Sequence, residues 1–221
     1  MSLWSTILEI VFPIKCVSCG DQGADLCVKC LSDSPPVERE NKKWIFSIFD
    51  YRHPPIKKAI KLMKYGGKKR IAYVLAEVMY GRILEELADL QIMENFRKPI
   101  LIPIPLSWKR RRGRGYNQAE LIAEKLIELD TKHENFTLEK GILIKIKNTE
   151  NQAHIEDRRE RLNNIIGSFS IKNNEGNMQK IKNRNIILID DVVTTGATLE
   201  EAKKVLRQAG VKKIIAFTIA H

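Results

Sequence analysis

The sequence contains no apolar run that approaches the roughly eighteen residues needed to cross a bilayer, so we expect no transmembrane helix. Its first residues are apolar, but they include Glu9 and have neither a basic start nor a small-residue cleavage site, which argues against a signal peptide. Leu3, Trp4 and Val11 instead fall at helical spacing, which predicts a short amphipathic helix in a cytoplasmic protein. Internal repeats and low-complexity tracts are also lacking, so a repeat architecture is not expected.

Acidic residues are outnumbered in this chain of 221 residues, which has a formal net charge of +11. Such a surplus indicates polyanionic or phosphorylated partners and says little about the fold. The alternative is that the charge serves only solubility. The length is sufficient for one sizeable core and a small accessory module.

Cysteine is confined to one short stretch, which holds two Cys-x-x-Cys knuckles: Cys16 with Cys19, and Cys27 with Cys30. Four thiolates at this spacing can surround one zinc ion tetrahedrally, and such a closed site is structural. The alternatives are two disulfides or a redox dithiol. A cytoplasmic compartment argues against disulfides, and no thioredoxin-like helix follows either knuckle. A polar, proline-containing connector comes next, so we expect a zinc-ribbon module at 1–40 and a main domain at 41–221.

The most informative stretch is residues 186–198, in which four aliphatic residues precede Asp190 and Asp191 and then a loop rich in hydroxyl groups. The aliphatic run predicts a strand buried on both faces of a parallel sheet, followed by a helix from about Thr198. Free backbone N–H groups, Gly196 and the helix dipole favour a bound phosphate, whereas the two carboxylates suit sugar hydroxyls or a metal ion. This combination predicts a ribose 5-phosphate site. The alternative is an ordinary buried strand whose acidic end caps the helix.

Further apolar segments near 100–104, 142–144, 167–171 and 213–219 predict additional core strands. Helices are expected over about 54–65, 69–90, 116–129 and 198–208, which gives an α/β fold with a mostly parallel sheet. The segment 44–51 is also expected to be a strand. The polar stretch 173–184 shows no chemical pattern and is predicted to be a turn region.

A basic run at 107–115 follows the strand at 100–104 and contains five cationic residues. A charge run of this kind is usually a solvated loop. Its place at the carboxyl end of a strand instead suggests pyrophosphate binding, since arginine binds such groups bidentately. The adjacent Trp108 also suggests a stacking platform for single-stranded DNA, with Arg110 and Arg111 as phosphate contacts. The alternative is that Trp108 is buried and the arginines serve only pyrophosphate.

The segment from Asp190 to Thr198 resembles the phosphoribosyl pyrophosphate (PRPP) signature of the type I phosphoribosyltransferases. Nearly the whole chain is similar to the competence-protein ComF family, a zinc ribbon fused to a phosphoribosyltransferase-like domain. The resemblance extends over the four cysteines, Lys64–Gly67, Pro103–Ala119, Gln152, Arg161, Asn164, Gly167 and Phe169. Where members of the family often carry arginines, this chain has Lys145 and Lys147, which keep the charge but lose the bidentate fork.

The resemblance implies Mg²⁺-dependent PRPP binding, with Asp190 and Asp191 at the ribose as the catalytic pair and 194–198 at the 5-phosphate. It also implies pyrophosphate contacts from Lys64, Arg112 and Arg114, and a loop at 145–161 that closes over the site. The residues assigned to PRPP are Asp190, Asp191, Val192, Val193, Thr194, Thr195, Gly196, Ala197 and Thr198, and those assigned to the mobile loop are Thr149, Gln152, Arg161 and Asn164.

Three functions stay open at this point. The chain is an enzyme that transfers phosphoribose to an acceptor, a DNA-uptake factor that uses PRPP only as a ligand, or a zinc-ribbon adaptor. The family's link with natural transformation adds single-stranded DNA and other competence proteins as candidate partners. An acid or base dedicated to an acceptor is not evident in residues 44–90.

Overall fold

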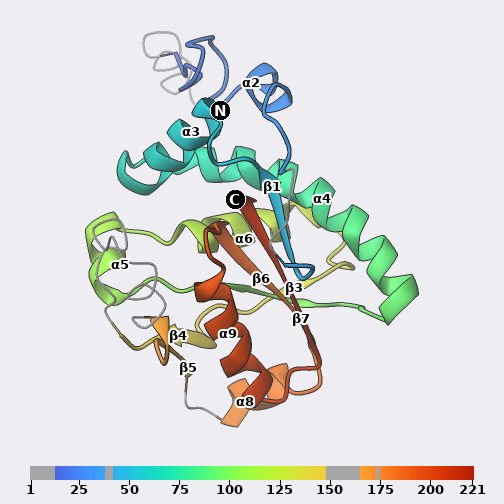
Figure 1. Cartoon of the computed structure of the whole chain (residues 1–221). Helices are drawn as coiled ribbons and strands as arrows, with labels where there is room; N and C mark the ends of the chain where they lie inside the picture. The colour runs from blue at the N-terminus through green and yellow to red at the C-terminus, as the bar shows by residue number, and fades with distance from the viewer. Residues whose placement is uncertain (1–12, 38–41, 148–164, 173–174) are drawn as a thin grey trace.

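The computed structural model describes residues 13–37, 42–147, 165–172 and 175–221, and it shows a central sheet with helices on both of its faces (Figure 1). The sheet has the strand order β1-β7-β6-β2-β3, and every pair is parallel. These strands are β1 (Ile45–Phe49), β7 (Lys213–Ala220), β6 (Asn185–Val192), β2 (Ile100–Pro103) and β3 (Thr137–Leu138). Because all the strands run the same way, the loops after β1, β2 and β6 meet at one edge.

Strand β6 lies inside the sheet, and alternate residues of it enter two separate hydrophobic cores. Ile187 and Ile189 pack into the core formed with α3 (Pro54–Tyr65), α4 (Arg70–Glu94) and α6 (Gln118–Leu129). Ile186 and Leu188 pack on the other face, into the core with α8 (Glu175–Ile181) and α9 (Ala197–Gln208). This two-sided burial explains the uninterrupted aliphatic run and confirms the predicted parallel α/β fold.

Two of the expected core strands do not belong to the parallel sheet. Strands β4 (Leu143–Lys145) and β5 (Phe169–Ile171) form a separate antiparallel pair, joined at Leu143–Ile171 and Lys145–Phe169. The expectation for 142–144 and 167–171 was therefore correct in structure type and wrong in partner. The sheet position at its edge is taken by β3, which the sequence did not reveal.

Two helices of the main domain also lie where none was expected. The basic run forms α5 (Trp108–Arg114) and not a loop, and α8 lies in the stretch predicted to be a turn region. Helix α5 ends at Gly115, which has a left-handed backbone (φ 77°) and donates its N–H to Arg111. Among the described residues, none of the helices has the length and apolar character of a bilayer span.

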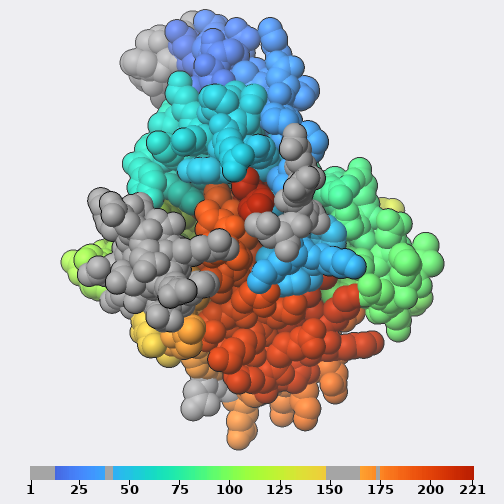
Figure 2. Space-filling model, viewed as in Figure 1, coloured from blue at the N-terminus to red at the C-terminus, as the bar shows by residue number. Residues whose placement is uncertain are grey.

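The cysteine-containing segment lies at one end of the molecule, beside α3 (Figure 2). It includes the short helix α2 (Val28–Ser32), and its buried Leu26, Cys16 and Cys30 share a hydrophobic core with α3 and α4. The N–H of Asp50 donates to Pro35 at 3.1 Å, which ties the connector to the end of β1. The predicted module therefore rests on the main domain through an apolar contact.

Candidate functional site

An anion cradle is formed where β6 runs into α9. Gly196 caps α9 with a left-handed backbone (φ 75°), a conformation that L side chains rarely adopt. The N–H of Ala197 lies 3.4 Å from Thr195 Oγ1, so the Thr195 side chain contributes a hydrogen bond within the turn. The hydroxyls of Thr194 and Thr198 line the same cavity. Backbone N–H groups, hydroxyls and the positive end of a helix of twelve residues therefore converge at a point suited to a phosphate.

The two carboxylates lie beside this cradle, at the end of β6. Asp191 is 8% exposed, and its Oδ1 accepts a charge-assisted bond from Lys64 Nζ at 2.8 Å. Asp190 Oδ1 accepts from the backbone N–H of Asp191 at 2.8 Å. Burial, and then the charge of Asp191, raise the pKa of Asp190 to about 7. Asp190 therefore titrates near neutral pH, and a bound cation would favour its ionised form.

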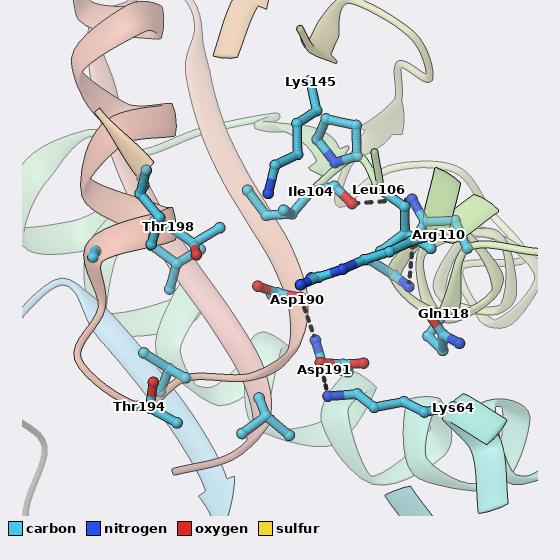
Figure 3. Close-up of a pocket in the computed structure, with 18 of the residues that line it drawn as sticks. Lys64, Ile104, Leu106, Arg110, Gln118, Lys145, Asp190, Asp191, Thr194 and Thr198 are labelled. Carbon is cyan, nitrogen blue, oxygen red and sulfur yellow. Dashed lines mark hydrogen bonds and ion pairs between the residues drawn. The ribbon is translucent and has the colours of Figure 1, made fainter. Parts of the chain in front are cut away.

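Four cationic side chains line the cavity, on α3, α5 and β4: Lys64, Arg110, Arg114 and Lys145. Figure 3 shows Lys64 and Lys145 approaching the Asp190–Asp191 pair from different elements. Burial would lower the pKa of Lys64, but Asp191 keeps it above its ordinary value. Burial, and then Arg110, lower the pKa of Lys145 to about 8. Burial and the neighbouring Arg114 also lower the pKa of Arg110. These groups repel one another and so favour an anionic ligand.

The segment Tyr116–Ala119 holds this cluster in place. The hydroxyl of Tyr116 donates to the carbonyl of Met63 at 2.5 Å, and Gln118 Nε2 lies 3.4 Å from the same oxygen. Both bonds fix the backbone immediately before Lys64. Asn117 caps α6 by accepting from Ala119 N at 3.1 Å, while its Nδ2 donates to the carbonyl of Ile104 at 3.0 Å. In the sequence these residues were identified only through family resemblance. Their hydrogen bonds indicate that they hold Lys64 and the chain after β2 in position.

The cavity has a volume of about 320 Å³. It is lined by the cradle, by the two carboxylates and by the four cations, together with Tyr51, Tyr65 and the chain after β2. An anion would bind at the cradle, a diol or a divalent cation at the carboxylates, and a second anion at the cations. The predicted segment Asp190–Thr198 is brought together in full along one wall.

The basic helix α5 divides its arginines between two directions. Arg110 and Arg114 are four residues apart, lie on one face and line the cavity. Trp108 and Arg112 are likewise four apart; Trp108 is 67% exposed, and the Arg112 guanidinium lies 5.1 Å from its ring centroid. Of the residues predicted to contact pyrophosphate, Lys64 and Arg114 line the cavity and Arg112 does not, while Arg110 lines it as well.

The loop predicted to close over the site lies mostly outside the described residues, as do Thr149, Gln152, Arg161 and Asn164. At its edges, Lys145 lines the cavity, and Lys147 Nζ donates to the carbonyl of Ile166 at 2.9 Å. The ammonium group of Lys147 is therefore hydrogen-bonded to the backbone, and Lys145 is the lysine of the two that lines the cavity.

The four cysteines form a second candidate site. Their sulfur atoms all lie within 4.8 Å of one another, and all four thiols are free rather than disulfide-bonded. Burial would raise the pKa of Cys16, but backbone N–H groups, including that of Cys27 at 3.4 Å, lower it to about 6. Four convergent sulfur ligands, one of them predisposed to ionise, fit the chemistry of a structural zinc ion.

The architecture and the site together define a phosphoribosyltransferase-type α/β domain that carries a four-cysteine module. The family model described as "Phosphoribosyl transferase domain" matches residues 119–221, which include the carboxylates and the cradle. Competence protein F of Haemophilus influenzae is 30% identical over 92% of this chain and 84% of its own length. The DNA utilization protein YhgH of Salmonella typhimurium is 26% identical over 88% of this chain and 78% of its own.

A solved hypoxanthine phosphoribosyltransferase of Staphylococcus aureus aligns with 65% of this chain and 62% of its own. The TM-score of this alignment is 0.35, and the sequence identity is 18%. The likeness to the Haemophilus protein covers 92% of this chain and so reaches beyond the residues of the family model. The chain belongs to the competence protein F (ComF) family.

Proposed function

We propose that this protein binds PRPP together with Mg²⁺ in the cavity at the end of β6 and acts as a phosphoribosyltransferase in DNA uptake. The observation that carries the proposal is the alignment of three subsites in one cavity: the cradle at 194–198, the Asp190–Asp191 pair and the four cations. A ligand with a phosphate at one end, a diol in the middle and a diphosphate at the other end matches this order. The relatives named for competence and DNA utilization support the biological setting.

In this proposal the residues position the substrate and stabilise charge. The cradle would bind the 5-phosphate, and Asp190 and Asp191 would accept hydrogen bonds from the ribose hydroxyls. The guanidinium groups of Arg110 and Arg114, with Lys145, would bind the pyrophosphate and stabilise its negative charge as the bond to the anomeric carbon breaks. Mg²⁺, when bound, would be held by oxygen ligands of the acidic pair and would neutralise part of the ligand's charge.

The proposal is tested by calorimetry with PRPP and Mg²⁺. The double variant Asp190→Asn/Asp191→Asn should lose about 1.5–3 kcal/mol of binding per carboxylate, since each makes a charge-assisted bond to the ribose. A matched control is Asp33→Asn/Asp89→Asn, which removes the same charge from two exposed sites. Equal affinity in wild type and the double variant would show that the ribose is misplaced. A screen of nucleobases for pyrophosphate release then asks whether turnover occurs.

A second candidate function is favoured by the surface of α5. Trp108 is exposed and stacked with Arg112, the combination of aromatic ring and cation that holds single-stranded nucleic acid. In this alternative the chain binds single-stranded DNA and uses PRPP as a ligand only. Fluorescence anisotropy with the variant Trp108→Ala/Arg112→Ala tests it, because that variant leaves the cavity intact and should bind the strand more weakly.

A further inference from the structure

The surface beside the cysteine module carries an unusual excess of positive charge. Residues 51–76 contain eight Lys and Arg residues and no Asp or Glu. One of the eight, Lys64, points into the cavity and is paired with Asp191. The others are exposed, so they are not explained by the PRPP site: Arg52, Lys57, Lys58, Lys61, Lys68, Lys69 and Arg70.

These cations are arranged in a line. Lys58, Lys61 and Tyr65 recur at spacings of three and four residues, which places them on one face of α3. Tyr65 is 73% exposed at the end of that helix. The turn into α4 continues the line with Lys68 and Lys69.

The line ends in a cleft of about 400 Å³ between this turn and the cysteine module. Lys15, Lys68, Lys69 and Arg70 line the cleft, with Asp25 as its one acidic group among the described residues. Asp25 is 5% exposed and lies 3.8 Å from Lys68 Nζ and 3.7 Å from Arg70 Nε, so one carboxylate offsets a small part of four positive charges.

The cysteine module supplies one wall of the cleft. Lys15 directly precedes Cys16, and the backbone there is fixed by the bonds from Cys16 N to Asp21 O at 2.7 Å and from Gly23 N to Ile14 O at 2.9 Å. A zinc ion held by the four thiols would therefore fix the position of Lys15. Figure 2 shows the module directly beside α3.

The line also meets α5, at its cavity-lining face. The guanidinium of Arg114 lies 5.0 Å from the ring centroid of Tyr65, so the two helices touch at the mouth of the PRPP cavity. Tyr65 and Tyr73 are the large apolar side chains exposed along α3 and the first turn of α4, and both are aromatic. Two separate tyrosine rings beside a phosphate track offer stacking surfaces for unpaired bases, whereas a membrane-binding face needs a larger buried apolar area.

We propose that the exposed face of α3, the α3–α4 turn and the cleft at the cysteine module bind the phosphates of single-stranded DNA. Tyr65 would give the bases a stacking surface, and the strand would pass the mouth of the PRPP cavity towards Trp108. The inference rests on the DNA-binding candidate function. It adds the location of the main phosphate contacts and a role for the cysteine module, which would hold Lys15 in place.

The test measures binding of a fluorescent oligodeoxythymidylate by anisotropy across a range of salt concentrations. The variant Lys15→Gln/Lys61→Gln/Lys69→Gln leaves the Asp25 ion pairs and Lys64 in place. It should reduce the log–log salt slope by about two units, since each phosphate contact to a single strand contributes about 0.7. The control Lys182→Gln/Lys204→Gln/Lys212→Gln removes the same charge from exposed positions around α8, α9 and β7 and should leave the slope unchanged.

A second variant, Lys58→Gln/Lys61→Gln, changes only α3 and should reduce the slope by about one and a half units if the triple variant does not fold. An unchanged slope in both variants overturns the inference. If Trp108→Ala/Arg112→Ala alone weakens binding, DNA uses α5 only, and the candidate DNA-binding function survives without this surface. Absence of DNA binding by the wild type would refute both the DNA-binding function and the proposed surface. Equally tight, lysine-dependent binding to anionic phospholipid vesicles would identify a membrane surface instead. Loss of PRPP binding in the calorimetric test would leave this inference standing.

Discussion

Replacing Asp190 by asparagine should stabilise the protein without ligand and abolish the strengthening of its PRPP binding between pH 6 and 8. The carboxyl group is half-buried beside Asp191, and its pKa is raised from 3.8 to about 7. The amide has nearly the same shape but no charge. The variant therefore removes an ionisation that folding disfavours and that the proposed ligand requires.

The direction in which stability changes with pH follows from proton binding. Because the pKa of Asp190 is higher in the folded state, the folded protein holds more protons between pH 4 and 7, and stability falls as the pH rises through this window. A rise from 3.8 to about 7 corresponds to roughly 4 kcal/mol at 1.36 kcal/mol per unit. The cavity is open to solvent, and Lys64 and Lys145 lie near the carboxylate, so solvent screening reduces this figure. We therefore expect the free energy of unfolding to fall by about 1–2 kcal/mol between pH 5 and 8.

The assay is urea denaturation at pH 5 and pH 8, compared between wild type, Asp190→Asn and the exposed control Asp89→Asn. The difference between wild type and Asp190→Asn should grow towards pH 8, while the control follows wild type. Calorimetry should show Mg²⁺–PRPP binding that strengthens from pH 6 to 8 in wild type only. A pH-independent difference in stability, or equal PRPP affinity in Asp190→Asn, would refute the reasoning.

The remaining predictions concern the cysteine module, Lys145 and Tyr116. Protein prepared without chelators should contain one zinc ion per chain, and a Cys→Ser replacement at 16, 19, 27 or 30 should loosen the N-terminal module but leave the sheet folded; elemental analysis without stoichiometric metal contradicts this. Pyrophosphate should bind wild type less well at pH 9 than at pH 7, because Lys145 has a pKa of about 8, whereas Lys145→Arg should keep its affinity, and calorimetry showing the same loss in both would exclude Lys145 as the cause. Tyr116→Phe should cost about 1 kcal/mol in urea denaturation and weaken PRPP binding through Lys64; unchanged PRPP affinity would show that Gln118 alone positions the lysine.

The parts of the fold that the sequence predicted well are those where burial dictates composition. Strand β6 is covered on both faces, so Ile186 to Ile189 had to be aliphatic and were readable as a strand. The partner of β4 was not readable, since three residues around Ile144 are compatible with either a parallel or an antiparallel neighbour. Its pairing with β5 depends on contacts far away in the chain.

The site shows the same division. The carboxylates and the cradle are contiguous in sequence, so their order alone predicted that they lie together at the end of a strand, where they line one cavity. Which arginines line the cavity could not be predicted, because the basic run was expected to be a loop, which has no fixed periodicity. Once it is a helix, positions 110 and 114 share one face and 108 and 112 share another, and this separates the cavity contacts from the exposed ones.

The distribution of charge around the cavity also suggests a direction for the ligand. The cradle at 194–198 offers backbone N–H groups and hydroxyls, whereas the four side-chain cations come from α3, α5 and β4. A helix terminus carries about half an elementary charge, so the cradle suits a single phosphate. Lys64, Arg110, Arg114 and Lys145 together suit a group with more negative charge. A ligand with one phosphate and one diphosphate is therefore expected to bind in one orientation, with its central hydroxyls held at Asp190 and Asp191. The reversed orientation would place the diphosphate at a single helix end, away from these four cations.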